Sequence, residues 1–112
     1  MWNEPTEERL MQLPKLYATE ETTWQDKIIH EHFFIFDCDW YMAEYSPQER
    51  NFFGYAILNG DLNNSEWGYI NFDELRDIRV NGIEIDRDLY WRVRRAGEVE
   101  KIVEAYQWPE SS

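Results

Sequence analysis

The chain has 112 residues, of which 23 are Asp or Glu and 11 are Lys or Arg, and its formal net charge is −12. Aromatic residues make up 17% of it, which excludes a disordered acidic tail, because such tails lack the apolar side chains that a core needs. The acidic balance also disfavours direct binding to nucleic acid, whose phosphate backbone carries the same sign of charge.

Length and composition predict one soluble, cytoplasmic domain that spans residues 1–112. Cys38 is the only cysteine, so an intramolecular disulfide is excluded and nothing indicates an oxidising compartment. The first eight residues are acidic and lack the basic and apolar regions of a signal peptide. Since the apolar runs are far shorter than the roughly 20 residues that span a bilayer, we expect no membrane association. We also expect no cofactor.

In chain order, the first predicted element is a short N-terminal helix within residues 1–12. Pro5 suits its first turn and Pro14 follows its end. From residue 28 the apolar side chains alternate with a period of two, which is typical of strands. Four strands are predicted on this basis, over residues 28–36, 40–45, 51–58 and 66–70.

The last third of the chain is predicted to combine a helix start, a further strand and a final helix. Asn71 and Glu74 match a helix N-cap and its third residue. Residues 88–94 alternate as a strand does, and residues 96–108 repeat apolar side chains at helical spacing. Because the connections between strands are short, the pattern favours an antiparallel sheet. We therefore predict an α+β fold, with four to five antiparallel strands and short helices packed on one face.

Two details of the strands bear on candidate sites. Alternation in residues 40–45 places Trp40, Met42 and Glu44 on one face, so a buried Glu44 would need a partner such as Arg87 or Arg92. Gly54 inside the following strand predicts a bulge or a close approach of two backbones.

His30 and His32 are two residues apart, so on a strand they would share a face and begin a metal site. Asp37, Cys38, Asp39 or Glu44 are candidates for the remaining ligands. The alternative is an ordinary hydrogen-bonded histidine pair, and we favour it because no second ligand motif occurs at fixed spacing.

Asp37, Cys38 and Asp39 are predicted to form the turn between the first two strands, where Asp needs only backbone hydrogen bonds. Paired carboxylates with separated pKa values would suit acid–base catalysis, and Cys38 would suit a nucleophile, but no recognised motif surrounds them. Residues 61–72 resemble a calcium-binding loop only in part, because Glu66 and Phe72 stand where the EF-hand pattern has Gly and Glu.

The one basic and aromatic cluster contains Tyr90, Arg92, Arg94 and Arg95. Such clusters can stack on single-stranded bases. In a chain of this charge, the favoured interpretation is an intramolecular counter-patch for neighbouring acids. We therefore expect no direct binding of nucleic acid.

The acidic surface itself is the strongest functional indication. It would suit a decoy that occupies a basic groove normally filled by nucleic acid, or it would serve solubility alone. Tryptophans are candidate anchors, because binding energy concentrates on them. The predicted interaction surface comprises Glu7, Glu8, Glu20, Glu21, Asp26, Trp24, Trp40 and Trp67.

Several segments together resemble an uncharacterised domain family, DUF2958. They are residues 13–20, His30, residues 33–34, 40–45, 51–54, 67–75 and 85–91. The resemblance covers about three-quarters of the chain in the right order. It implies a setting in plasmids, phages and other mobile elements, and it implies no activity and no catalytic residues.

Three hypotheses of function follow. The first is a small non-enzymatic protein-interaction domain, in its sharper form an acidic inhibitor of a host protein that binds nucleic acid. The second is a metal-dependent or catalytic module built around His30 and His32. The third is a homodimeric structural adaptor that pairs through an exposed strand edge.

Overall fold

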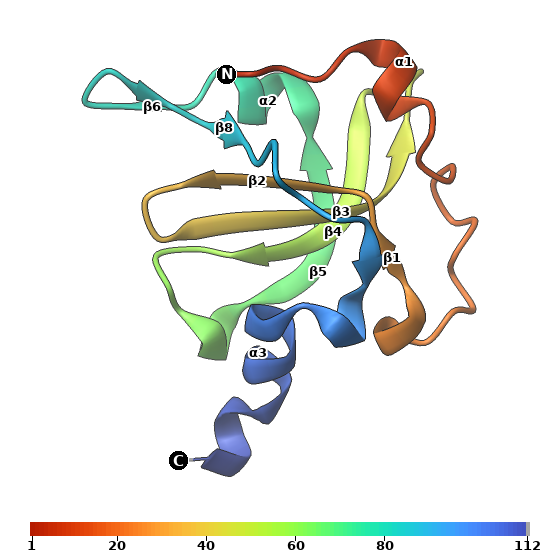
Figure 1. Cartoon of the computed structure of the whole chain (residues 1–112), viewed down its shortest axis with the longest axis vertical. Helices are drawn as coiled ribbons and strands as arrows, with labels where there is room; N and C mark the ends of the chain where they lie inside the picture. The colour runs from red at the N-terminus through yellow and green to blue at the C-terminus, as the bar shows by residue number, and fades with distance from the viewer. Residues whose placement is uncertain (112) are drawn as a thin grey trace.

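The computed structural model describes the backbone of residues 1–111 and the side chains of residues 1–107. It combines short helices, some of them 3₁₀ helices (η), with short strands (Figure 1). In chain order the elements are α1 (Glu7–Leu10), η1 (Trp24–Asp26), β1 (Ile28–Ile29), β2 (Glu31–Ile35), β3 (Cys38–Ser46), β4 (Asn51–Ile57), η2 (Leu62–Asn64), β5 (Glu66–Asn71), α2 (Phe72–Arg76), β6 (Arg79–Val80), β7 (Ile83–Glu84), β8 (Asp86–Arg87), β9 (Arg94–Arg95), η3 (Ala96–Glu98) and α3 (Glu100–Ser111).

The main sheet has five antiparallel strands in the order β5-β4-β3-β2-β8. Strands β2 to β5 follow one another as a meander, because their connections are too short for a parallel crossover. β8 returns beside β2, and Trp2 forms an isolated bridge with Asp86 beyond it. Two further strand pairs, β1 with β9 and β6 with β7, lie outside this sheet. The predicted α+β class and the antiparallel sheet are confirmed.

Both faces of the sheet are covered, which corrects the expectation that the helices pack on one face. Successive side chains of β3 point to opposite faces, and Trp40, Tyr41, Met42 and Ala43 are all buried there. Trp40 and Met42 pack with residues of α1 and α2, whereas Tyr41 and Ala43 pack with residues of η3 and α3. Because both faces of the central strand are apolar, each face requires its own helices.

A β-bulge in β3 changes which side chains share a face. The register with β4 shifts between Met42 and Glu44, so Glu44 does not share the face of Trp40 and Met42 as strict alternation predicted. Gly54 lies opposite, where an added Cβ would come within 2.4 Å of the Tyr41 carbonyl oxygen. The predicted close approach of two backbones at Gly54 is therefore confirmed.

The first predicted strand is divided, and its turn lies earlier than expected. His30 separates β1, which pairs with β9, from β2, which pairs with β3 and β8. The chain reverses at Phe36, whose φ of 48° is in the left-handed region, and Asp37. Cys38 and Asp39 belong to β3, so the predicted turn over residues 37–39 is wrong.

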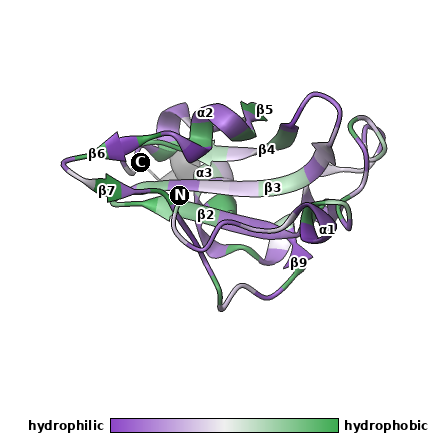
Figure 2. Ribbon diagram, turned by 90° about the horizontal axis from the view of Figure 1, so that it is seen from above, coloured by the Kyte–Doolittle hydropathy of each residue, from purple (hydrophilic) through white to green (hydrophobic). Residues whose placement is uncertain are grey.

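The predicted strand over residues 88–94 is also wrong. Only Arg94 of this segment lies in a strand, at the start of β9, because β8 ends at Arg87 and Asp88 organises a turn after it. The Tyr90 backbone N–H donates to Asp88 Oδ1 at 3.0 Å, and the Trp91 N–H donates to the Asp88 carbonyl at 3.2 Å. Figure 2 shows this segment, which leads into β9, projecting from the molecule.

The helices are close to the prediction at the C-terminus and shorter at the N-terminus. Asn71 caps α2 by accepting from the Glu74 N–H, as expected. α1 has four residues, with Thr6 as its N-cap, in place of a helix over most of residues 1–12. The C-terminal segment begins as η3 and continues as α3, on whose inner side Val99 and Ile102 are buried. Within the described chain, every helix is too short or too polar to cross a membrane.

Candidate functional site

Four charged side chains from distant segments meet on the face of the sheet that η3 and α3 cover. His32 Nε2 donates to Asp39 Oδ1 at 2.7 Å, and His32 Nδ1 donates to Asp88 Oδ2 at 3.0 Å. Lys101 Nζ on α3 donates to Asp39 Oδ2 at 2.8 Å. We call His32, Asp39, Asp88 and Lys101 the polar cluster. It joins β2, β3, the segment after β8 and α3.

Aromatic rings hold the imidazole of the polar cluster in place. Tyr41 lies opposite His32 in the β2–β3 register, and the two rings stack with centroids 4.5 Å apart and planes 7° apart. The indole of Trp91 closes another side, with its centroid 5.3 Å from the His32 ring. Trp91 is itself fixed, because its Nε1 donates to the Ile29 carbonyl at 2.9 Å and the Arg94 guanidinium lies 3.9 Å from its ring centroid.

Both ring nitrogens of His32 and both carboxylate oxygens of Asp39 have hydrogen-bond partners within the polar cluster. Burial alone would raise the pKa of Asp39, but the hydrogen bonds and charges of His32 and Lys101 hold that pKa below its ordinary value. Burial, reinforced by the Asp39 charge, raises the pKa of Tyr41.

This geometry favours a positioning role for the polar cluster over catalysis. A general base or a metal ligand needs a free ring nitrogen, and both nitrogens of His32 are occupied. The cluster ties the segment after β8 to the sheet, and that segment presents Tyr90 with 95% of its surface exposed. We conclude that the cluster fixes an exposed loop against the sheet.

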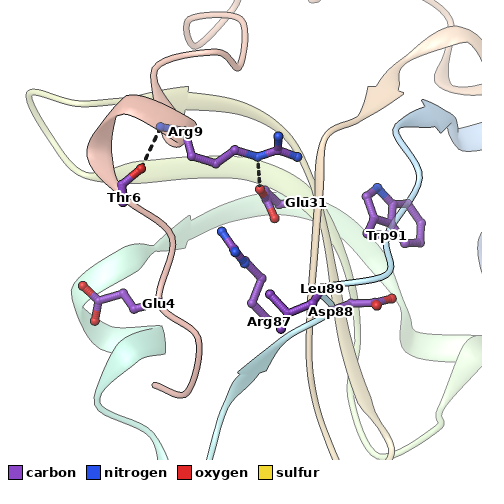
Figure 3. Close-up of a pocket in the computed structure, with 8 residues that line it drawn as sticks. All are labelled: Glu4, Thr6, Arg9, Glu31, Arg87, Asp88, Leu89 and Trp91. Carbon is purple, nitrogen blue, oxygen red and sulfur yellow. Dashed lines mark hydrogen bonds and ion pairs between the residues drawn. The ribbon is translucent and has the colours of Figure 1, made fainter.

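A groove lies beside the polar cluster and shares Asp88 with it, and Trp91, which packs on His32, also lines the groove (Figure 3). Glu31, 2% exposed, lies at its base and accepts from Arg9 Nε at 2.6 Å. Arg87 points into the groove from the opposite side and forms no ion pair within the described chain. We call this the arginine groove. Its volume is about 450 Å³, and it is lined by Glu4, Thr6, Arg9, Glu31, Arg87, Asp88, Leu89 and Trp91.

The structure does not bring together the residues of the candidate metal site that we considered less favoured. His30 lies in the break between β1 and β2, where burial and then the Arg9 charge lower its pKa. Cys38 is half-buried, and its Sγ accepts from the Asn59 N–H at 3.3 Å. Among the described residues, no three His, Cys, Asp or Glu side chains converge in a way that could hold a metal ion. Neither His30 nor His32 is therefore supported as a ligand.

Glu44 is buried as expected, but its partners are backbone groups. Its carboxylate accepts from the N–H of Tyr17 at 2.8 Å and of Thr19 at 3.0 Å, and also from the Thr19 hydroxyl. The predicted ion pair with Arg87 or Arg92 is wrong, because the bulge in β3 turns Glu44 toward the loop of residues 15–22. Glu44 is a structural carboxylate that orders this loop.

The predicted interaction surface is only partly available to a partner. Trp40 is 7% exposed within the core, so its prediction as an interface anchor is wrong. Trp24 stacks on Tyr106 with ring centroids 3.7 Å apart, and Trp67 Nε1 donates to the Tyr106 hydroxyl at 2.8 Å. These two indoles fasten α3 to the sheet region while remaining half-buried.

The five predicted acidic residues are all exposed, but two of them are neutralised. Glu7 pairs with Arg50, and Asp26 pairs with Arg95. Arg95 also pairs with Glu98 at 3.0 Å, so the predicted intramolecular counter-patch is confirmed for this arginine. The three other residues of the set form no ion pair among the described side chains. They are Glu8, Glu20 and Glu21.

Sequence reasoning missed Asp88, Lys101, Glu31 and Arg9. Lys101 is the one base on α3, so the sequence could have predicted that it pairs with a carboxylate. Asp88 lies two residues before Tyr90 and three before Trp91, and Asp at such a position is compatible with the turn that it organises. Glu31 and Arg9 carry no local signal, because their contact joins segments 22 residues apart.

Comparisons with models of known protein families, with curated proteins and with solved structures each found no match. The interpretation of the site therefore depends on its own geometry. The resemblance to DUF2958 stays a prediction.

Proposed function

We propose that this chain is a non-enzymatic protein-interaction domain that binds a basic partner through exposed carboxylates at one end of its sheet. The observation that carries the proposal is a group of exposed acids that form no ion pair with any described side chain. We call this group the acidic end. It consists of Asp37, Asp61, Glu66, Glu100 and Glu104.

Neighbouring elements bring these acids together. The Gly60 N–H donates to the Asp37 carbonyl at 2.8 Å, which joins the β2–β3 turn to the loop before η2. η2 in turn contacts α3, which carries Glu100 and Glu104. Lys101 is the one described base on these elements, and Asp39 occupies it. The acids at this end therefore lack local neutralisation.

Bases elsewhere are largely used within the molecule. Arg50 pairs with Glu7 and Asp73, Arg79 pairs with Glu84, and Arg95 pairs with Asp26 and Glu98. The surplus of negative charge is thus left on the exposed acids, and it would steer a basic partner toward them in a salt-dependent way. A groove that normally holds nucleic acid has the matching charge. The setting that we propose is the cytoplasm, as an accessory protein of a phage or plasmid.

The test compares two triple variants that change the net charge equally. One reverses the acidic end with Asp37→Lys, Glu66→Lys and Glu104→Lys. The control reverses exposed, unpaired acids elsewhere with Glu20→Lys, Glu21→Lys and Glu49→Lys. Each variant and the wild type serve as bait in host lysate, with elution by rising salt.

We expect the wild type and the control to retain a protein that the acidic-end variant loses. The captured protein, once purified, should bind nucleic acid in competition with this domain. If both triple variants lose the captured protein equally, its binding depends on net charge alone and not on the acidic end. Capture of no protein by the wild type would contradict the proposal.

A further inference from the structure

The arginine groove holds more cationic hydrogen-bond donors than its own acids use. Glu31 accepts from Arg9 Nε, which leaves both terminal nitrogens of Arg9 without a hydrogen bond in the described chain. Arg87 forms neither a side-chain hydrogen bond nor an ion pair among the described residues, and its guanidinium points into the groove (Figure 3). Two guanidinium groups therefore face one buried carboxylate.

Charges around this centre do not supply the missing anion. Both carboxylate oxygens of Asp88 are already hydrogen-bonded, to His32 Nδ1 and to the Tyr90 N–H. Glu4 is exposed at the rim, and Figure 3 shows its carboxylate directed away from Arg87. Arg9, Arg87 and Glu31 together leave one positive charge inside the groove, although the protein as a whole is strongly negative.

An apolar wall stands next to these donors. The indole of Trp91 lines the groove, and Leu89 lines it with 56% of its surface exposed. The Trp91 ring is fixed by its hydrogen bond to the Ile29 carbonyl, so the wall is preorganised. A polar donor pair beside a rigid apolar wall is the usual composition of a small-molecule subsite.

We infer that the arginine groove binds a small organic anion, whose carboxylate or phosphate lies between Arg9 and Arg87 and whose apolar part lies against Leu89 and Trp91. Guanidinium groups match the oxygens of both anions in charge and in planar geometry. The site is independent of the acidic end and takes a ligand of the opposite charge.

The experiment is a titration of the ¹⁵N-labelled full chain, followed by backbone amide and tryptophan Nε1 NMR signals. The probes are phenylacetate, phenyl phosphate, acetate, inorganic phosphate and the neutral 2-phenylethanol. We expect saturable shifts of the Trp91 Nε1 signal and of residues 87–91 with one of the two aromatic anions. The preferred anion then distinguishes a carboxylate ligand from a phosphate ligand. Equal binding of 2-phenylethanol, or shifts spread over the whole surface, would overturn the inference.

Variants separate a built site from general charge effects. Arg87→Gln should weaken anion binding by about tenfold or more, because a charged hydrogen-bond donor is lost. The control Arg92→Gln removes the same charge from an exposed residue outside the groove lining and should leave the affinity within about twofold. Equal loss in both variants would contradict a built site.

A second variant tests the sign of the charge at the site. Glu31→Gln keeps the shape of the side chain and removes the competing negative charge, so anion affinity should rise. A fall in affinity, in a variant whose amide spectrum shows the folded state, would place the ligand elsewhere.

Discussion

Replacement of Asp39 by Asn tests whether the polar cluster stabilises the fold. The substitution preserves the volume of the side chain, so it changes charge and hydrogen bonding without opening a cavity. Asp39 is 4% exposed and accepts from His32 at 2.7 Å and from Lys101 at 2.8 Å. Its loss of charge therefore weakens one buried contact and one contact to a half-exposed amine.

The magnitude follows from these two contacts. A hydrogen bond to a charged group contributes about 1.5–3 kcal/mol, and a neutral amide would keep roughly half of it for the His32 contact. The side chain of Lys101 is 55% exposed, so its ion pair contributes no more than about 1 kcal/mol. We expect Asp39→Asn to lower the free energy of unfolding by about 2 kcal/mol at pH 7, whereas the control Lys101→Ala should cost about 1 kcal/mol or less.

The pH dependence gives an independent check. Because the pKa of Asp39 in the folded protein lies below its ordinary 3.8, the unfolded chain takes up the proton first as the pH falls. The stabilisation is thus complete above pH 3.8 and is lost as the pH falls through the lower, folded-state pKa. Urea unfolding, followed by tryptophan fluorescence between pH 7 and 3, measures both effects. A cost below about 0.5 kcal/mol at pH 7, or one that does not shrink toward pH 3, would refute the assignment.

Three further predictions concern the sheet and its loops. Gly54→Ala should destabilise the fold by about 3 kcal/mol in urea unfolding, because its Cβ would come within 2.4 Å of a carbonyl oxygen. In the control Gly68→Ala the added Cβ meets nothing within 4 Å, so the substitution should cost less than about 1 kcal/mol. Burial and then the Glu7 charge raise the pKa of Tyr45 from 10.0 to about 12, so the unfolded chain ionises first and stability is lost as the pH rises from 10 to 12. Tyr45→Phe should remove this part of the alkaline destabilisation, and an unchanged pH profile would contradict the reasoning. Glu44→Gln should loosen the loop of residues 15–22, because a neutral amide is a weaker acceptor for the backbone N–H groups of that loop. Protease should then cleave the loop at least about tenfold faster than in the wild type, and equal cleavage rates would contradict this role of Glu44.

Local patterns in the sequence were sufficient where one segment decides its own conformation. Alternating apolar residues predicted β2 to β5, and Asn71 with Glu74 predicted the start of α2. Composition predicted the surplus of exposed acids, because buried carboxylates need specific partners and the 23 acids outnumber the 11 bases. These outcomes depend on backbone period, capping and solvation, which act over a few neighbouring residues.

Local patterns failed where distant segments compete for one strand. Alternation over residues 88–94 is real, but the turn at Asp88 leaves only Arg94 of this segment in a paired strand, where β9 pairs with β1. The bulge in β3 likewise moved Glu44 to another face, and it arises from the fit of two strands rather than from either strand alone.

Sequence alone thus determined the fold class, the antiparallel order of the meander and the acidic character of this protein. Tertiary structure alone decided that Asp39 is buried, that His32 meets Asp88, and that Asp39 meets Lys101, contacts that join residues 56 and 62 positions apart in the chain. It also placed Arg9 and Arg87 on either side of Glu31. The reason is physical: a charge is buried only where the complete fold brings its partner within hydrogen-bond distance, and short-range patterns carry no information about that partner.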